Sequence, residues 1–199
     1  MKSLIKFLVR ESIEEEIRQK SELGMGRDHI VYSFEKDPSK IIKVAYIGDW
    51  GKPVGRGVLK ASHIEKMLDY PDIFPRVYKH NDRYAIIEKL NTDEIENDDE
   101  ILYDVVSKYD LSLFKDSTTV SSAIEEMFWR GTKNPNLLHK LRELVIMDKD
   151  LEPSEKRVTI NYIDFFLKIK EQIPNASDLD VHSENIGYNS KGVLKLLDF

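Results

Sequence analysis

The sequence predicts an α+β protein in which a small β-rich lobe precedes a helical lobe. Three observations lead to this fold class. Short β-prone runs separated by turn residues fill the chain to about residue 90, four segments with helical periodicity follow, and a short hairpin comes near the end. The 199 residues, 41% of them apolar, can bury a core in two small lobes. We therefore predict a first lobe over 1–90 and a second over 91–199.

The first lobe is expected to begin with a helical segment that extends to about Lys20. Within it, Ser12-Ile-Glu-Glu15 has the pattern of a capping box, which marks a helix N-terminus. A turn that contains Gly24 and Gly26 then leads into a strand ending near Tyr32. Backbone N–H groups of a glycine-containing turn can point toward phosphates. Because Gly-x-Gly is also common in ordinary loops, this signal gains weight only beside a second motif.

A second strand over 41–45 carries Lys43 among apolar neighbours, where a cation needs a partner or a path to solvent. From there Lys43 could reach the α- and β-phosphates of a nucleotide under the glycine turn. The helix predicted over 56–70 carries Glu65, which could pair with Lys43 or could equally be a solvated residue of a charged helix. Two further strands are predicted over 74–80 and 84–90.

The second lobe is predicted to contain helices over 101–109, 120–130, 135–147 and 153–173. Turns that contain Asp, Asn or Pro separate them. Tyr162, Phe165 and Phe166 cluster on the last helix, and we expect them to be core residues rather than a ligand site. Phe128 and Trp129 are expected in the core as well.

The most informative motif is Asp180-Val-His182-Ser-Glu-Asn185, which Asp198 follows after a short interval. A carboxylate beside an attacking hydroxyl, then an amide and a second carboxylate that converge on Mg²⁺, is the set that phosphoryl transfer from ATP requires. Four fixed identities at average usage recur by chance at roughly one start in 10⁵. The motif therefore indicates an ATP-dependent phosphotransferase.

The interval between the two metal-ligand candidates supports this interpretation. Short β-prone runs at 186–188 and 193–197 flank Asn189-Ser-Lys-Gly192, a turn in which Gly supplies the positive φ. Because a hairpin brings its ends together, Asn185 and Asp198 are expected on the same side, where one cation could touch both. The alternative is a surface hairpin whose Asp and Asn residues only cap turns.

The order of these elements resembles the protein-kinase-like fold shared by protein kinases and aminoglycoside-type phosphotransferases. The chain is most similar to the early Ser/Thr protein kinases of T7-type bacteriophages. This similarity rests on short segments, namely Gly24-x-Gly26 with Tyr32, Ile42-Lys43-Val44, Pro75-x-Val77-Tyr78 and Asp180-x-His182-Ser183-x-Asn185-Ile186.

The resemblance implies that Asp180 is the catalytic base and that Asn185 and Asp198 hold Mg²⁺. His182 takes the place where protein kinases carry a Lys, and would touch the transferring phosphate. The implied activity is ATP-dependent phosphorylation of Ser or Thr, with bacterial host proteins as substrates in the host cytoplasm.

The same resemblance assigns nucleotide contacts to the first lobe. Lys43 would anchor the ATP phosphates, with Glu65 as its partner, and Gly24 and Gly26 would shape the loop above them. Backbone groups around Glu88 and Leu90 would hold adenine.

Departures from the family pattern keep two alternatives open. His29 replaces a glycine, Asp178-Leu179 stands where protein kinases have His-Arg, and no activation segment or peptide-docking helix follows Phe199 in this sequence. Substrate recognition is therefore expected to use other surfaces or a partner protein. The chain could instead be a pseudokinase that acts by binding a host protein, or a kinase of small hydroxyl compounds.

Composition narrows the remaining classes. The net charge of −6 argues against direct nucleic-acid binding, and the basic residues are dispersed. The acidic runs at 14–16 and 93–100 are expected to be solvated, with a docking surface for a basic target as the alternative. The absence of cysteine excludes disulfides and fits a cytoplasmic protein. We expect neither a membrane span nor a signal peptide.

Overall fold

The computed structural model describes the chain over 22–25, 29–34, 36–45, 61–81, 84–109, 111, 122–173, 175–176 and 179–197. The predicted N-terminal helix, Gly26 and Asp198 lie outside these residues. The fold is α+β, as predicted, and the chain divides into two compact units. The first comprises Met1–Leu68 and Arg76–Lys89, and the second comprises Asp69–Pro75 and Leu90–Phe199.

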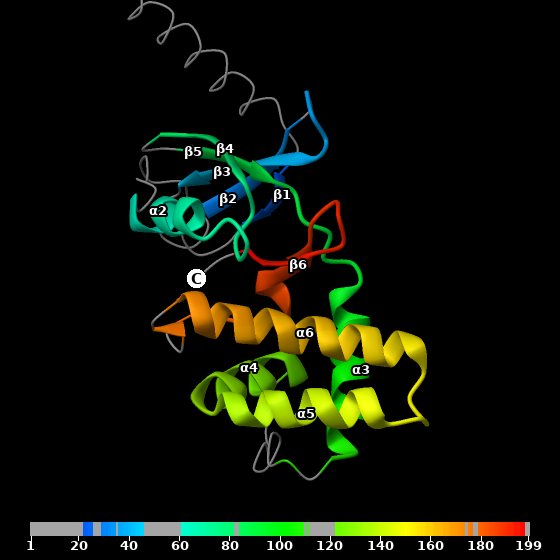
Figure 1. Cartoon of the computed structure of the whole chain (residues 1–199). Coiled ribbons are helices and arrows are strands. Elements are labelled where there is room, and N and C mark those ends of the chain that lie inside the picture. Colours follow the sequence, from blue (N-terminus) through cyan, green and yellow to red (C-terminus); the bar gives the residue numbers. More distant parts are fainter. Residues whose placement is uncertain are drawn as a thin grey trace, which may run out of the picture. The chain divides into compact units, whose positions relative to one another are not determined.

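The first unit contains a five-stranded antiparallel sheet in the order β1-β2-β3-β5-β4 (Figure 1). Its strands are β1 (Glu22–Met25), β2 (His29–Ser33), β3 (Lys40–Ala45), β4 (Val77–His80) and β5 (Tyr84–Glu88). The sequence placed Gly24 in a turn, and this was wrong, because Gly24 belongs to β1 and pairs with Val31. The register shifts between Glu22 and Gly24, and such an irregularity is a common place for glycine in a strand.

The core of the first unit lies against its two central strands. Ile42, Tyr84 and Ile86 are buried together, and three partly buried residues pack against them, namely Tyr32, Phe34 and Val44. Helix α2 (Ala61–Asp69) buries Ile64 and Met67 and exposes the residues between them, as an amphipathic helix does.

The turn between β2 and β3 is closed by Asp37. Its carboxylate accepts a hydrogen bond from the Ser39 backbone N–H at 3.1 Å and pairs with Lys40 Nζ at 2.6 Å. The hydrogen bond from Lys40, supported by those from Ser39, lowers the pKa of Asp37 to about 2. This local bonding closes the turn that immediately precedes β3.

The described residues of the second unit form four α-helices, a short 3-10 helix (Ser183–Asn185) and a two-stranded hairpin (Figure 1). The helices are α3 (Ile95–Ser107), α4 (Ala123–Lys133), α5 (Pro135–Met147) and α6 (Pro153–Gln172). The predicted bounds of the last two are confirmed within one residue. α3 begins six residues before the predicted 101, because the acidic run that precedes it is helical rather than a loop.

Helix α6 is the centre of this unit, since α3, α4 and α5 all pack against it. Tyr162 and Phe166 are fully buried, and Phe165 is nearly so, which confirms that these aromatic residues form the core. The Phe128 ring meets the Phe166 ring edge-on at 5.4 Å between centroids. Trp129 was predicted to be a core residue, and this prediction is wrong. It is 39% exposed, with Lys133 Nζ 4.6 Å from its ring centroid.

Polar caps define where the later helices start. Asp99 of α3 accepts hydrogen bonds from Ser122 Oγ at 2.7 Å and from the Ile124 N–H at 2.8 Å, which ties α3 to the first turn of α4. At the start of α6, the Glu152 N–H donates to the Glu155 carboxylate at 2.7 Å in a capping box. Within the described residues, no helix is both long and apolar enough to span a membrane.

Candidate functional site

The loop that carries Asp180 is held by the two residues beside it. Leu179 and Val181 are 3% and 2% exposed, whereas the Asp180 side chain is 73% exposed. The Val181 N–H donates a hydrogen bond to the Leu179 carbonyl at 3.1 Å, so the chain makes a tight turn centred on Asp180. Because both flanking side chains are buried, the Asp180 carboxylate is the one that faces outward. The described residues provide no hydrogen-bond donor to that carboxylate, which leaves it free to accept a proton from a substrate.

Asn185 closes this loop through its side-chain amide. Its Nδ2 donates to the Asp180 backbone carbonyl at 3.1 Å, and the same Nδ2 lies 2.8 Å from His182 Nε2. A carbonyl oxygen can only accept, so the nitrogen of the amide must face Asp180. His182 Nε2 then accepts from this amide, and Asn185 Oδ1 is left pointing away from both contacts.

His182 is close to Asp180 but is not its ion-pair partner in this arrangement. The distance from His182 Nε2 to Asp180 Oδ2 is 3.7 Å, longer than a hydrogen bond. Because Nε2 accepts a hydrogen bond from the Asn185 amide, it carries no hydrogen that it could donate to Asp180. Apart from His182, the described residues place no cationic side chain within ion-pair distance of the Asp180 carboxylate.

A hairpin follows directly, as predicted, with strands β6 (Ile186–Tyr188) and β7 (Leu194–Leu196). Gly192 has φ +73° in the turn, where a side chain would be strained. The Asn189 side-chain oxygen accepts hydrogen bonds from the Lys191 and Val193 N–H groups, both at 3.0 Å. Each feature shortens the turn and keeps the strands paired.

The hairpin returns to the loop through the backbone. The Leu197 N–H donates to the Asn185 carbonyl at 2.7 Å, so the residue before Asp198 is bonded to Asn185. Asp198 itself lies outside the described residues. The Asn185 side-chain oxygen and the Asp198 carboxylate, one residue after Leu197, are oxygen ligands of the kind that Mg²⁺ prefers.

Two chain segments hold the hairpin in the second unit. Asn91 and Tyr188 exchange two backbone hydrogen bonds of 2.8 Å, and Gly187 lies against Leu90 so closely that an added Cβ would be 2.8 Å from the Leu90 Cβ. On the other side, Ile73 accepts from the Leu196 N–H at 2.8 Å, and the Pro71 carbonyl accepts from Lys195 Nζ at 2.7 Å. The sequence did not indicate this second support.

A buried carboxyl group beside the hairpin was also missed. Asp98 of α3 is 4% exposed, and its Oδ2 accepts from the Tyr188 hydroxyl at 2.6 Å and from the Tyr162 hydroxyl at 3.2 Å. The run 93–100 was expected to be solvated, which is wrong for this residue. Burial raises the pKa of Asp98 and also the pKa values of both tyrosines. The only signal in the sequence was Tyr188, three residues after Asn185, the last residue of the motif.

The predicted nucleotide contacts lie mainly in the first unit. Lys43 is 8% exposed on β3, opposite Val31 of β2 and Ala85 of β5. Glu65 is exposed on α2, and no ion pair of it occurs among the described residues, so the structure does not bring it to Lys43. This outcome corresponds to the alternative of a solvated surface residue.

The residues proposed to surround adenine belong to different units. Glu88 is half-buried in the first unit, where its Oε2 accepts from the Arg76 N–H at 3.3 Å. Leu90 is 6% exposed in the second unit. Among the described residues, no group of three or more His, Cys, Asp or Glu side chains could hold a metal ion.

Comparison with known proteins adds no assignment. No protein-family model matches the chain, and no curated protein shows significant similarity to it.

Proposed function

We propose that this chain is an ATP- and Mg²⁺-dependent phosphotransferase of the protein-kinase-like type that phosphorylates Ser or Thr of bacterial host proteins. One observation carries the proposal. The Asn185 side chain bonds to the Asp180 backbone, while the Asn185 carbonyl accepts from Leu197, immediately before Asp198. This arrangement supports a grouping of the three residues that the sequence motif assigns to catalysis.

The proposed reaction uses Asp180 as the base. The oxygen of a substrate hydroxyl forms a bond to the γ-phosphorus of ATP, the bond from that phosphorus to the bridging oxygen breaks, and ADP leaves. The hydroxyl proton passes to the Asp180 carboxylate, whose exposed position favours access by a protein side chain. Mg²⁺ held by Asn185 Oδ1 and Asp198 would offset the charge on the phosphates.

The remaining roles concern the nucleotide. Lys43 is proposed to anchor the α- and β-phosphates, and backbone groups around Glu88 and Leu90 to hold adenine. Lys43 is 8% exposed, so a phosphate that reached it would interact with its charge largely away from bulk water. His182 lies one residue beyond Val181 in the Asp180 loop and is proposed to touch the transferring phosphate.

The test compares two carboxylates of the same loop. The parent protein, Asp180→Asn and Glu184→Gln are each incubated with Mg²⁺ and γ-labelled ATP in a bacterial lysate, and labelled proteins are resolved on a gel. Glu184 is exposed and has no role in the proposal, so it is the matched control. Asp180→Asn should lower labelling by about 10²- to 10⁴-fold, while Glu184→Gln should leave it unchanged.

Nucleotide binding separates the assigned roles. A fluorescent ATP analogue should bind the parent and Asp180→Asn alike, because Asp180 contacts the substrate hydroxyl rather than the nucleotide. Labelling that persists in Asp180→Asn would refute the base assignment. Binding of ATP without Asp180-dependent labelling of any protein would favour a pseudokinase, and turnover with an isolated hydroxyl compound would favour a small-molecule kinase.

A further inference from the structure

Two adjoining pockets follow α6 on the side of the β6–β7 turn. They share Asn161 of α6 and Gly192 of the turn. The smaller pocket has a volume of about 200 Å³ and the larger about 490 Å³. Asp180, His182 and Asn185 line neither of them. The hairpin therefore carries the candidate catalytic loop at one end and these pockets, called the α6 trough below, near its turn.

The larger pocket has the chemistry of a cation site. Asp98 lines it and is 4% exposed. Both tyrosine hydroxyls donate to Asp98 Oδ2, and the described residues supply no donor to Oδ1. A buried carboxylate oxygen without a donor is costly, so a positively charged group entering the pocket would gain a strong interaction there.

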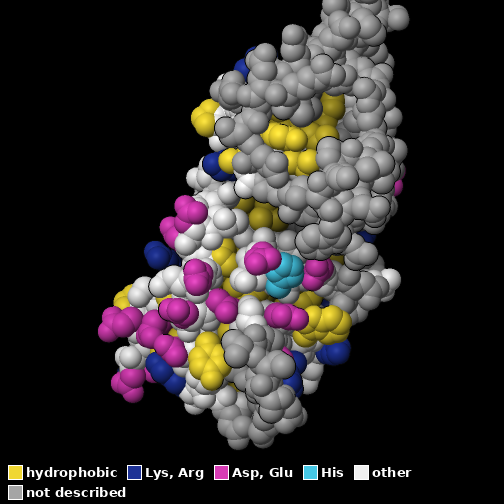
Figure 2. Space-filling view, turned by 180° about the vertical axis from the view of Figure 1, so that it is seen from behind, with side chains coloured by type: hydrophobic (Ala, Val, Ile, Leu, Met, Phe, Trp, Pro, Cys, Tyr) yellow, Lys and Arg dark blue, Asp and Glu magenta, His cyan; other side chains and the backbone are white. Residues whose placement is uncertain are grey.

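Other residues around this pocket favour the same charge. Glu94 adds a second carboxylate and Arg157 a single positive charge, so the lining is net negative. Side-chain amides that can accept further N–H bonds come from Asn91, Asn97 and Asn161. Figure 2 shows that Asp and Glu side chains gather on the side of the helical unit that carries α3.

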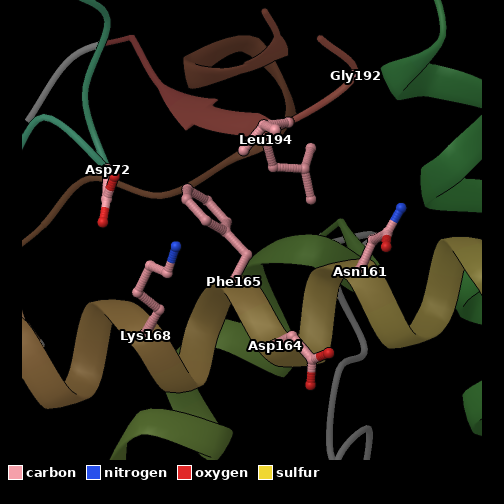
Figure 3. A pocket seen from close by; sticks show the side chains of 8 residues that line it. Asp72, Asn161, Asp164, Phe165, Lys168, Gly192 and Leu194 are labelled. Carbon is pink, nitrogen blue, oxygen red and sulfur yellow. The ribbon is translucent and has the colours of Figure 1, made fainter.

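The smaller pocket combines an apolar part, made by Phe165, Val193 and Leu194, with charged residues. The charged residues are Asp72, Asp164 and Lys168. In Figure 3, the Phe165 ring extends from α6 toward the strand that carries Leu194, and the Leu194 side chain extends from that strand toward α6. Asn161 and Gly192, which the larger pocket shares, lie toward the same end. Val193 also lines it and is 43% exposed, an unusual degree of exposure for a β-branched apolar side chain beside a pocket. An apolar side chain of a partner could cover these groups.

The spacing of the two pockets suits an extended peptide. Val158 lines the larger pocket and Phe165 the smaller, seven positions further along α6. At a rise of 1.5 Å per residue, this separation is about 10 Å. An extended chain covers that distance in about three residues at 3.3 Å each.

We propose that the α6 trough docks an extended segment of a protein substrate in which an arginine or lysine stands three residues from an apolar side chain. The basic group enters the larger pocket beside Asp98 and Glu94, and the apolar group covers Phe165 and Val193. The occupant is named as a substrate on the strength of the proposed function.

The test measures peptide binding without ATP, so it does not depend on catalysis. The probe is the fluorescein-labelled peptide Gly-Arg-Ser-Gly-Leu-Leu-Gly, and binding is followed by fluorescence anisotropy. A second peptide carries citrulline, which has nearly the shape of arginine but no charge, and a third carries serine in place of both leucines. Citrulline should weaken binding by at least about 10-fold, and serine by several-fold.

Variants of the protein locate the site. Asp98→Asn keeps an acceptor for the tyrosine hydroxyls but removes the charge, so it should weaken binding of the arginine peptide by about 10-fold. Glu94 lines the pocket, is exposed, and makes no side-chain hydrogen bond that caps α3. Glu94→Gln should therefore weaken binding by about 2- to 5-fold without affecting the fold. Glu143→Gln, on the exposed face of α5, is the control and should have no effect.

Three results would overturn the proposal: absence of binding up to about 1 mM peptide, equal binding of the arginine and citrulline peptides, and binding that Glu94→Gln leaves unchanged. If Asp98→Asn does not fold, as judged by thermal unfolding, the Glu94 variant alone decides. Binding that follows these expectations while no Asp180-dependent labelling occurs would remove the kinase assignment but leave the docking site in place. Asp180-dependent labelling without peptide binding would remove the docking site but leave the kinase assignment in place.

Discussion

The Asp180 loop and the strand that carries Lys43 are stabilised in different ways in this chain. The bonds within the Asp180 loop join residues close in sequence, such as Asn185 to Asp180 and Leu197 to Asn185, although distant segments around Ile73 and Asn91 anchor the hairpin that follows. Lys43 is positioned instead by pairing with Ala85, 42 positions away. The catalytic loop can therefore form its geometry locally, whereas the nucleotide contacts depend on assembly of the whole sheet.

This difference explains where sequence reasoning succeeded. The hairpin at 186–197 was predicted because Gly192 and the β-prone runs act over a few residues, and the structure confirms it. Gly24 was placed in a turn because its motif says nothing about β1 pairing with β2. Local motifs predict local geometry, while strand pairing requires the rest of the fold.

The largest expected effect tests whether the Asn185 amide builds the loop. Asn185→Asp keeps an oxygen for a metal but can no longer donate to the Asp180 carbonyl, and it brings a second negative charge close to Asp180. Phosphotransfer should fall by about 10²-fold or more, measured as initial rates with labelled ATP.

The matched control is the second asparagine of the hairpin. Asn189 uses its side-chain oxygen only as an acceptor, from the Lys191 and Val193 N–H groups, so Asn189→Asp preserves both bonds. Its rate should change by less than about 3-fold. Equal losses in the two variants would mean that a negative charge anywhere on the hairpin is harmful. The hydrogen bond from the Asn185 side-chain amide would then not be what holds the loop.

A smaller effect is expected where the hairpin meets the segment after β5. Gly187→Ala would place a Cβ 2.8 Å from the Leu90 Cβ and 3.1 Å from the Asn91 carbonyl oxygen, so one of the two segments must shift. We expect a loss of about 1–3 kcal/mol in the free energy of unfolding, measured by urea denaturation.

Gly192 provides the comparison for this change. It has φ +73° and no atom near its missing Cβ, so Gly192→Asn, which tolerates that conformation, should cost only a few tenths of a kcal/mol. If Gly187→Ala were as harmless as Gly192→Asn, the contact with Leu90 would not be needed to hold the hairpin.

The sequence predicted helix positions better than it predicted which polar side chains are buried. The limits of α5 and α6 follow from Pro135 and Pro153 at their starts and from their apolar periodicity. Trp129 was assigned to the core because it is large and apolar, but it faces solvent beside Lys133. Helical periodicity predicts that α4 forms, but the elements that pack against α4 determine which of its faces is buried.

Asp98 shows the same limit for a charged residue. It lies in an acidic run whose other members are mostly exposed, and nothing local distinguishes it from them. Its burial results from Tyr162 and Tyr188, 64 and 90 positions away in sequence. No pattern within α3 could reveal partners that the fold brings from α6 and the hairpin.

The smallest expected effect concerns this buried carboxyl group and its dependence on pH. Burial raises the pKa of Asp98, an effect that the two tyrosine hydrogen bonds and the nearby Arg157 oppose and that Glu94 reinforces. The folded state then binds the Asp98 proton more tightly than the unfolded state does. The stability that Asp98 contributes is therefore complete below the ordinary Asp pKa of about 3.9 and is lost as the pH rises through its raised pKa.

Asp98→Asn removes this titration while keeping an acceptor for both hydroxyls. Relative to the parent, the variant should become more stable as the pH rises from about 4 toward neutrality, by about 1.4 kcal/mol for each unit by which the pKa is raised. Urea denaturation at a series of pH values measures the difference. Asp104→Asn, an exposed change on α3, should show no such trend. A difference between Asp98→Asn and the parent that stays constant with pH would mean that Asp98 is ionised at no cost, because the hydrogen bonds from Tyr162 and Tyr188 fully compensate for its burial.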